Sequence, residues 1–147
     1  MFMKNKKGFT LVELLATIVI LAILITTAVT VVLPIIERAR KNAFITEAKE
    51  YMKAARSASV DNALENEHDT EATTSCFEIS ELTGEYVKND KGNYSGTVTI
   101  DNTVQGAPLE TISITNGKYY IVATNEITKQ DVKKEMPADY VASCTTP

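Results

Sequence analysis

The sequence contains few of the residues on which enzyme active sites depend. It has a single histidine, His68, and it has neither a glycine-rich phosphate loop nor the motif of a nucleophile elbow. No set of cysteine and histidine residues has metal-site spacing, and one histidine among acidic neighbours is a poor set of ligands. These absences argue against an enzyme, and we expect neither a metal nor another cofactor.

Positive charge is also scarce. The 147 residues carry 15 Lys and Arg against 19 Asp and Glu, which gives a net charge of −4 and a pI of about 5.1. A protein that binds nucleic acid through bulk positive charge has the opposite balance, so we predict no direct nucleic-acid binding. The length allows no more than one ordinary domain.

One long stretch has no charged residue at all. The 23 residues from Leu14 to Ile36 are uncharged and largely apolar, and about 20 such residues span the hydrocarbon core of a bilayer. Residues 37–147 carry 12 basic and 18 acidic residues, a net charge of −6. We therefore expect a hydrophobic transmembrane segment followed by a small acidic soluble region, which argues against a cytosolic enzyme.

The apolar stretch is preceded by three lysines, as in the basic region of a secretory signal: Lys4, Lys6 and Lys7. A conventional signal peptide would be cleaved after its apolar core, and Thr26-Thr27-Ala28 is the available small-residue site. The chain stays apolar on both sides of that site, and the stretch exceeds the roughly 7–15 residues of an ordinary signal core. Conventional cleavage is therefore the less favoured interpretation.

The residues from Lys6 to Leu15, Lys-Lys-Gly-Phe-Thr-Leu-Val-Glu-Leu-Leu, resemble the processing signature of type IV prepilins and pseudopilins. The shared features are a short basic leader, Gly8 before the cleavage point, Phe9 after it, and Glu13 at the fifth position of the mature chain. The resemblance implies cleavage between Gly8 and Phe9 by a prepilin peptidase on the cytoplasmic side, followed by N-methylation of the Phe9 amine.

The same resemblance divides the chain into segments. Residues 1–8 would be a leader peptide, residues 9–36 a transmembrane and filament-core helix, and residues 37–147 a soluble pilin head. The head would consist of an amphipathic helix at 37–64 and an α/β part at 65–147.

Glu13 is unusual because it is a carboxylate at the edge of an apolar helix. A charge in the middle of a membrane costs about 2.5–3.5 kcal/mol, and less near a helix end, so headgroup-level placement alone would make Glu13 tolerable. Cleavage at Gly8 would place a cationic amine four residues before it, and an opposite charge within about 4–6 Å favours the ionised carboxylate. In this family the glutamate of one subunit pairs with the amine of a neighbour, so the resemblance implies that Glu13 acts in subunit assembly.

Helical periodicity continues after the apolar stretch, with a 4-3-4-3 spacing of apolar residues: Phe44, Ala48, Tyr51, Ala55 and Ala58. No glycine or proline occurs between Pro34 and Leu64. We expect one helix over residues 9–64, with this apolar stripe packed against the rest of the head. Pro34 has no backbone donor, which predicts a kink or local unwinding between Thr30 and Pro34.

The C-terminal part of the sequence predicts a small sheet. Ser75–Glu78 has capping-box spacing before a short helix containing Ile79 and Leu82. The acidic segment 65–71 is expected to be a loop, and the polar segment Glu126–Met136 a turn or a short helix. Alternating patterns predict three antiparallel strands: Ser95–Asp101, Thr111–Thr115 and Lys118–Thr124.

Asn116-Gly117, between the last two strands, is typical of a two-residue hairpin turn. Such a turn would place Ile114 opposite Tyr119 and Ile112 opposite Ile121, which gives the sheet an apolar face. The expected fold is α+β, a long N-terminal helix packed by a small antiparallel sheet, and this is the pilin fold that the resemblance implies.

Two cysteines, Cys76 and Cys144, both lie in the expected head. An even number of cysteines in an exported protein suggests a disulfide, whereas a reducing compartment would leave two free thiols. Many pilins close their C-terminal region with such a bond, so the resemblance also implies this pairing.

The leading functional prediction is a major or minor structural subunit of a type IV pilus-like filament. It would be held in the cytoplasmic membrane by a single span and then assembled at the cell surface. Its expected partners are the prepilin peptidase and methyltransferase, membrane lipid, an inner-membrane assembly platform, and other copies and minor pilins.

Two alternatives stay open. One is a pseudopilin of a type II secretion or competence system, which is built by the same chemistry. The other is a membrane-anchored extracellular binding domain that does not polymerise, and it predicts no cleavage at Gly8 and no effect of replacing Glu13.

Overall fold

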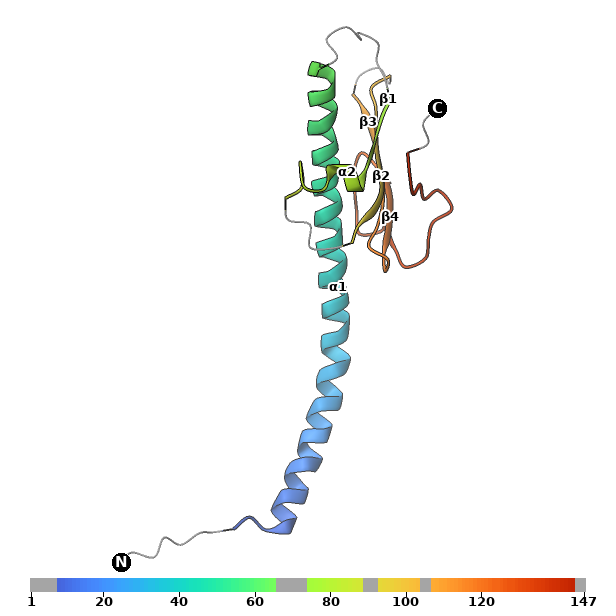
Figure 1. Ribbon diagram of the computed structural model, residues 1–147. Helices are drawn as coiled ribbons and strands as arrows, with labels where there is room; N and C mark the ends of the chain where they lie inside the picture. Colours follow the sequence, from blue (N-terminus) through green and yellow to red (C-terminus); the bar gives the residue numbers. More distant parts are fainter. Residues whose placement is uncertain (1–7, 66–73, 89–92, 104–106, 145–147) are drawn as a thin grey trace, which may run out of the picture. The chain divides into compact units, whose positions relative to one another are not determined.

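The computed structural model describes residues 8–65, 74–88, 93–103 and 107–144, shown in Figure 1. The chain divides into two compact units, Met1–Ala39 and Arg40–Pro147. We call residues 11–36 the stem and the second unit the head. Most of the expected leader, residues 1–7, and most of the expected acidic loop, including His68, lie outside the described residues.

Helix α1 extends from Leu11 to Glu65, close to the predicted range of 9–64. Its first part belongs to the first unit and its last part, from Arg40, to the second. The helix continues through Pro34, so the unwinding expected between Thr30 and Pro34 does not occur. Pro34 has no backbone N–H, so the helix loses one hydrogen bond at this position. An apolar helix tolerates this loss where the turns on either side and nearby threonine hydroxyls keep their own hydrogen bonds.

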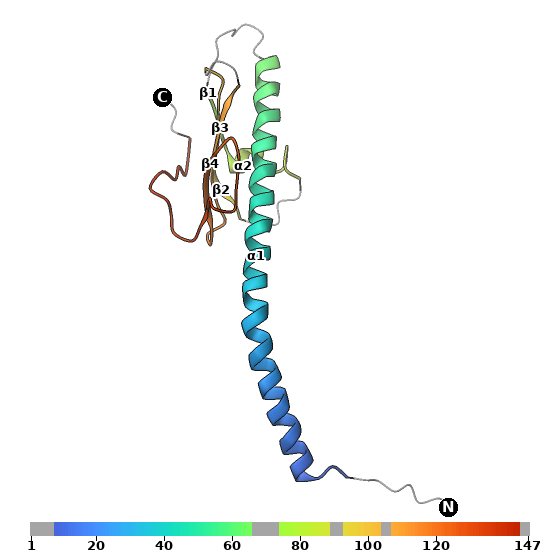
Figure 2. The ribbon, with the colours of Figure 1, turned by 180° about the vertical axis from the view of Figure 1, so that it is seen from behind.

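The head contains one antiparallel sheet in its described residues, and this sheet lies along the part of α1 that follows Arg40 in Figures 1 and 2. Its strands follow chain order and each pairs with the next: β1 (Thr74–Glu78), β2 (Ser95–Asp101), β3 (Leu109–Thr115), β4 (Tyr120–Thr124) and β5 (Val132–Lys133). Three strands were predicted, and the described residues contain five. The two missed strands, β1 and β5, are at the edges of the sheet, where a single neighbouring strand gives a weaker sequence pattern. Strand β5 lies within Glu126–Met136, the segment predicted to be a turn or a short helix.

The short helix α2 (Ile79–Leu82) is where the sequence predicts it, but its predicted start is wrong. Ser75–Glu78 belongs to β1, where Ser75 pairs with Ile100. The helix begins after Glu78, whose backbone N–H donates to Glu81 Oε2 at 3.0 Å. Pairing with β2 therefore takes precedence over the capping pattern, and the cap forms three residues later in the chain.

The predicted hairpin between β3 and β4 is present with a different register. Ile114 pairs with Ile121, and Ile112 pairs with Ala123, because the connection has four residues rather than two. The Asn116 side-chain oxygen accepts hydrogen bonds from the backbone N–H groups of Lys118, at 3.1 Å, and Tyr119, at 2.9 Å. These bonds draw Tyr119 into the turn. A shift of two residues keeps each side chain on its original face, so the apolar face of the sheet is preserved.

The core of the head lies between this apolar face and the predicted stripe of α1. Each residue of the stripe is buried, with Phe44 1% and Tyr51 0% exposed. On the sheet, Ile112, Ile114 and Ile121 are each 0% exposed, and the Tyr119 ring lies 6.3 Å from the Phe44 ring. The fold is thus the predicted α+β pilin-like arrangement, a long helix followed by a small antiparallel sheet.

Candidate processing and assembly site

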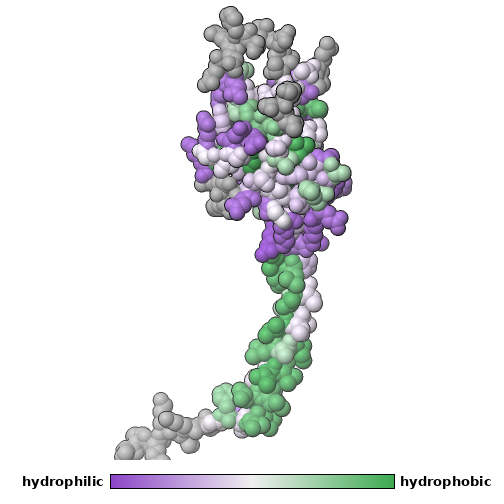
Figure 3. Space-filling model, turned by 45° about the vertical axis from the view of Figure 1, so that its right-hand side comes forward, coloured by the Kyte–Doolittle hydropathy of each residue, from purple (hydrophilic) through white to green (hydrophobic). Residues whose placement is uncertain are grey.

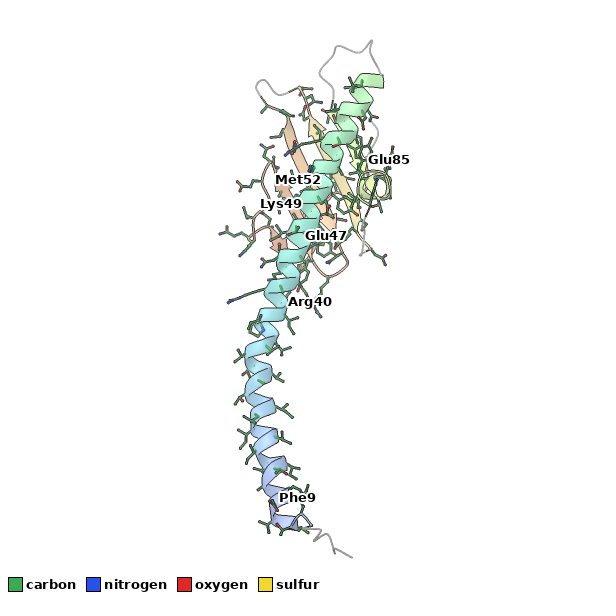
Figure 4. The ribbon with its side chains drawn as sticks, turned by 90° about the vertical axis from the view of Figure 1, so that its left-hand side faces the viewer. Phe9, Arg40, Glu47, Lys49, Met52 and Glu85 are labelled. Carbon is green, nitrogen blue, oxygen red and sulfur yellow. A yellow bond between two sulfur atoms is a disulfide. The ribbon has the colours of Figure 1, made fainter. Side chains whose placement is uncertain are left out.

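The residues around the expected cleavage point precede the helix. Gly8, Phe9 and Thr10 come before Leu11, the first residue of α1, and all three are exposed. The Phe9 side chain is 81% exposed, and Figure 4 shows it at the N-terminal end of α1. Both residues of the expected cleavage point are therefore exposed and outside the helix, as is typical of sites of proteolysis.

Thr10 is the N-cap of α1 and contacts Glu13. The Glu13 backbone N–H donates to Thr10 Oγ1 at 3.3 Å, and the Thr10 hydroxyl donates to Glu13 Oε2 at 3.5 Å. A threonine cap satisfies one of the free N–H groups at a helix start, and an acidic residue in the first turn complements the helix dipole. Local capping therefore holds the Glu13 carboxylate in the first turn of α1.

The stem presents a continuous apolar surface. Its large side chains are exposed, from Leu11 at 82% to Ile36 at 41%, and Figure 3 shows them as an apolar surface. The hydroxyls of its threonines donate to backbone carbonyls of the preceding turn: Thr17, Thr26, Thr27 and Thr30. By length and composition this helix can cross a membrane. These threonine hydroxyls are thus satisfied within the helix, as an apolar environment requires.

The C-terminal segment of the head is held against the sheet. Cys76 in β1 and Cys144 form a disulfide across a sequence separation of 68 residues. The Val141 backbone N–H donates to Ser113 Oγ at 2.7 Å, and the Thr97 hydroxyl donates to the Val141 carbonyl at 3.3 Å. The two sheet residues are each 2% exposed. The structure therefore contains the disulfide that the resemblance implies, together with hydrogen bonds that hold the same segment.

Helix and sheet are joined by an ion pair between Arg56 in α1 and Glu110 in β3. Both Nε and Nη2 of Arg56 donate to the carboxylate, and Glu110 is 8% exposed in its side chain. The hydrogen bond with Glu110 raises the pKa of Arg56, although partial burial opposes the shift. Next to this pair, Asn125 Oδ1 accepts from the Glu110 N–H at 2.9 Å, which fixes the end of β4 to β3.

Several residues of these contacts were not predicted from the sequence. Thr10 could have been found, because Thr10-Leu-Val-Glu13 has capping-box spacing. Arg56, Glu110 and Ser113 gave no signal, because their roles depend on partners far along the chain. Among the described residues there is no group of three or more potential metal ligands.

A family profile for the prokaryotic N-terminal methylation motif matches residues 3–29, which cover Gly8, Phe9 and Glu13. No curated protein and no solved structure matches the chain. The matched motif is the type IV prepilin signature, and proteins that carry it are structural rather than catalytic. The motif implies processing by a prepilin peptidase and polymerisation with other pilins.

Together with the apolar helix, the motif fits a precursor held in the membrane and later assembled into an extracellular filament. The chain therefore carries the signature of a type IV pilin-like or pseudopilin precursor.

Proposed function

We propose that this protein is a structural subunit of a type IV pilus-like extracellular filament. The observation that carries the proposal is the methylation motif at residues 3–29, which extends into a stem with an exposed apolar surface. A surface of this kind needs lipid or other apolar helices around it, because water cannot solvate it favourably. A membrane supplies the first environment, and a bundle of stems supplies the second.

The maturation step is cleavage between Gly8 and Phe9. It removes residues 1–8 as a leader, leaves residues 9–36 as the membrane and filament-core segment, and leaves residues 37–147 as the soluble part, which contains the head. Methylation of the Phe9 amine keeps that amine cationic. The exposed position of Gly8 and Phe9 before α1 supports this assignment.

Glu13 selects the position of each subunit in the filament. Within the described part of the chain, its carboxylate has the Thr10 hydroxyl as a partner but no cation. Moving an ionised carboxylate into an apolar bundle is unfavourable unless an opposite charge compensates it. The methylated Phe9 amine of a neighbouring copy provides that charge, so the buried position of Glu13 is stable only when the subunits are correctly aligned.

The specific partners follow from this route. The precursor meets membrane lipid first, then the prepilin peptidase and methyltransferase, then an inner-membrane assembly platform, and finally other copies and minor pilins. The net charge of −6 on residues 37–147 argues against direct nucleic-acid binding.

A pseudopilin of a secretion or competence system is the second candidate, since the methylation motif at residues 3–29 fits it equally. The length of the fibre separates the two functions. A pilus subunit forms long surface fibres that can be sheared from cells, whereas a pseudopilin forms short fibres that stay in the envelope.

The experiment is mass spectrometry of the mature protein together with fibre recovery. We expect an N-terminus at a methylated Phe9, and we expect the protein in fibres sheared from cells. The Glu13→Val variant should be processed but absent from fibres, whereas Glu135→Val, at an exposed position of the head, should assemble normally. An intact Met1, a start near Val29, or normal assembly of Glu13→Val would contradict the proposal.

A further inference from the structure

A small cleft with a partly cationic rim lies beside α1 in the head. Its volume is about 340 Å³, and it is formed between α1 and the segment that follows β4. Met52 and Ile127, 5% and 3% exposed, provide apolar lining. Lys49 and Lys53, four residues apart on α1, provide cations. The cleft thus combines an apolar lining with two ammonium groups.

The charge of the cleft is not neutralised from within. The third cation of the lining, Arg56, is paired with Glu110. Lys49 and Lys53 have no ion pair with any described residue, and Glu126 is the acidic side chain of the lining. Two unpaired lysines against one carboxylate leave about one net positive charge. The surrounding residues 37–147 carry −6, so the cleft differs in sign from the head as a whole.

A rigid acidic projection occurs elsewhere on the same head. Glu85 is exposed in a turn that follows α2, and no described residue pairs with its carboxylate. The Gly84 N–H donates to the Val87 carbonyl at 3.0 Å, and the Val87 N–H donates to the Leu82 carbonyl at 3.0 Å. Leu82 and Val87 are buried at 1% and 3% exposure. The turn is therefore fixed at its base, so binding has to order the side chain of Glu85 but not its backbone.

Figure 4 shows Lys49 and Glu85 on opposite flanks of α1. Lys49 and Glu85 therefore lie apart within one head, whereas the cleft of one copy can face the Glu85 turn of a second copy. A contact between two different surfaces of identical subunits is heterologous, and repetition of such a contact produces an open helical assembly. This is the symmetry that a filament subunit needs.

We propose that the Glu85 carboxylate of one copy binds between Lys49 and Lys53 of the next copy and sets the lateral register of the heads. This contact rests on the proposed filament function. The apolar lining lowers the local dielectric around the ion pairs, which strengthens them relative to pairs in open water. The contact weakens as salt is raised, because the lysines stay at the rim of the cleft and are screened.

The test compares full-length variants in cells that make wild-type fibres. Lys49→Glu/Lys53→Glu reverses the charge of the two cleft lysines, and Glu85→Lys reverses the charge at the turn. The triple variant combines these changes, so that the two surfaces again carry opposite charges with their signs exchanged. Lys129→Glu/Lys133→Glu is the matched control, because it makes the same change of net charge at exposed positions away from the cleft. The measured quantity is the ratio of this protein in sheared fibres to the processed protein in the cells.

We expect this ratio to fall at least about tenfold for the cleft reversal and for Glu85→Lys, and to recover in the triple variant. The control should stay within about twofold of wild type, since a change of surface charge alone contributes little. A cleft reversal that assembles normally, or a triple variant that does not recover, would overturn the proposal. The second result would show that the cleft binds a different anion. Absence of the wild-type protein from all fibres would instead refute the proposed filament function.

Discussion

The backbone of Gly96 in β2 lies directly against the carbonyl of Ser113 in β3. A Cβ atom added at Gly96 would lie 1.9 Å from the Ser113 oxygen, and the φ angle of Gly96 is +127°. No L-residue combines this backbone conformation with this approach without strain. The absence of a side chain at Gly96 thus allows β2 and β3 to approach closely at this point. Ser113 in β3 in turn holds the C-terminal segment, through its hydrogen bond with Val141.

Gly96→Ala should lower the free energy of unfolding of the head by at least about 3 kcal/mol, because it adds both backbone strain and a steric clash. The measurement is urea unfolding of the processed protein in detergent, followed by circular dichroism. Gly117→Ala is the matched control. It has a positive φ of +79° but no atom within 4 Å of the added Cβ, so it should cost only about 1–2 kcal/mol. Equal losses for the two variants would show that the close approach does not matter.

Replacing Arg56 with Met should destabilise the head by about 1–2 kcal/mol. The methionine keeps part of the packing but leaves the Glu110 carboxylate buried without its cation. The stabilisation that the ion pair provides is limited, because the Arg56 side chain is 57% exposed. A double-mutant cycle with Glu110→Gln separates the pair from its environment. If the two losses simply add, the ion pair contributes nothing to stability.

Removing the disulfide with Cys76→Ser/Cys144→Ser should cost about 4 kcal/mol, which is the chain-entropy value for a closed loop of this length. Reduction of the wild-type protein should have a similar effect. Amide exchange at Val141 should increase more than exchange at Ile121 in the middle of the sheet, because the C-terminal segment would keep only its hydrogen bonds to Ser113 and Thr97. Unchanged protection at Val141 would mean that those bonds hold the segment by themselves.

Asp101 at the end of β2 should make a pH-dependent contribution to the stability of the folded head. The Thr103 hydroxyl donates to its carboxylate at 2.6 Å, the Thr103 N–H at 2.9 Å and the Thr74 hydroxyl at 3.2 Å, and these bonds lower the pKa of Asp101 from 3.8. A pKa that is lower in the folded state than in the unfolded state stabilises the fold at pH values above the unfolded pKa. This stabilisation is lost as the pH falls through the folded pKa.

Thermal unfolding of wild type and Asp101→Asn should therefore differ at neutral pH, and the difference should shrink below about pH 4. Thr103→Val, which removes the shortest of these hydrogen bonds, should reduce the same difference. A gap between wild type and Asp101→Asn that stays constant from neutral to acidic pH would contradict this role of the carboxylate.

Local patterns predicted the elements that depend on neighbouring residues. The apolar stripe of α1 from Phe44 to Ala58 is visible because helical periodicity places these residues on one face, and all of them are buried. The position of α2 was also predicted, because Ile79 and Leu82 are followed by Gly84. The assignment of Ser75–Glu78 failed because pairing of β1 with β2 depends on residues 19 to 25 positions away.

The sequence by itself determined the candidate processing site, the uncharged stretch from Leu14 to Ile36 and the α+β class, because each depends on residue types and spacings within a short stretch. Only the tertiary structure decided the register of the hairpin, the two outer strands, the pairing of Arg56 with Glu110 and the cleft at Lys49 and Lys53. The hairpin register depends on the hydrogen bonds of the Asn116 side chain within the turn, and the other features depend on contacts between residues far apart in the chain. Hydrogen bonds such as those of the Asn116 side chain, and close approaches such as that of Gly96 to Ser113, select among arrangements that one hydrophobic pattern allows equally.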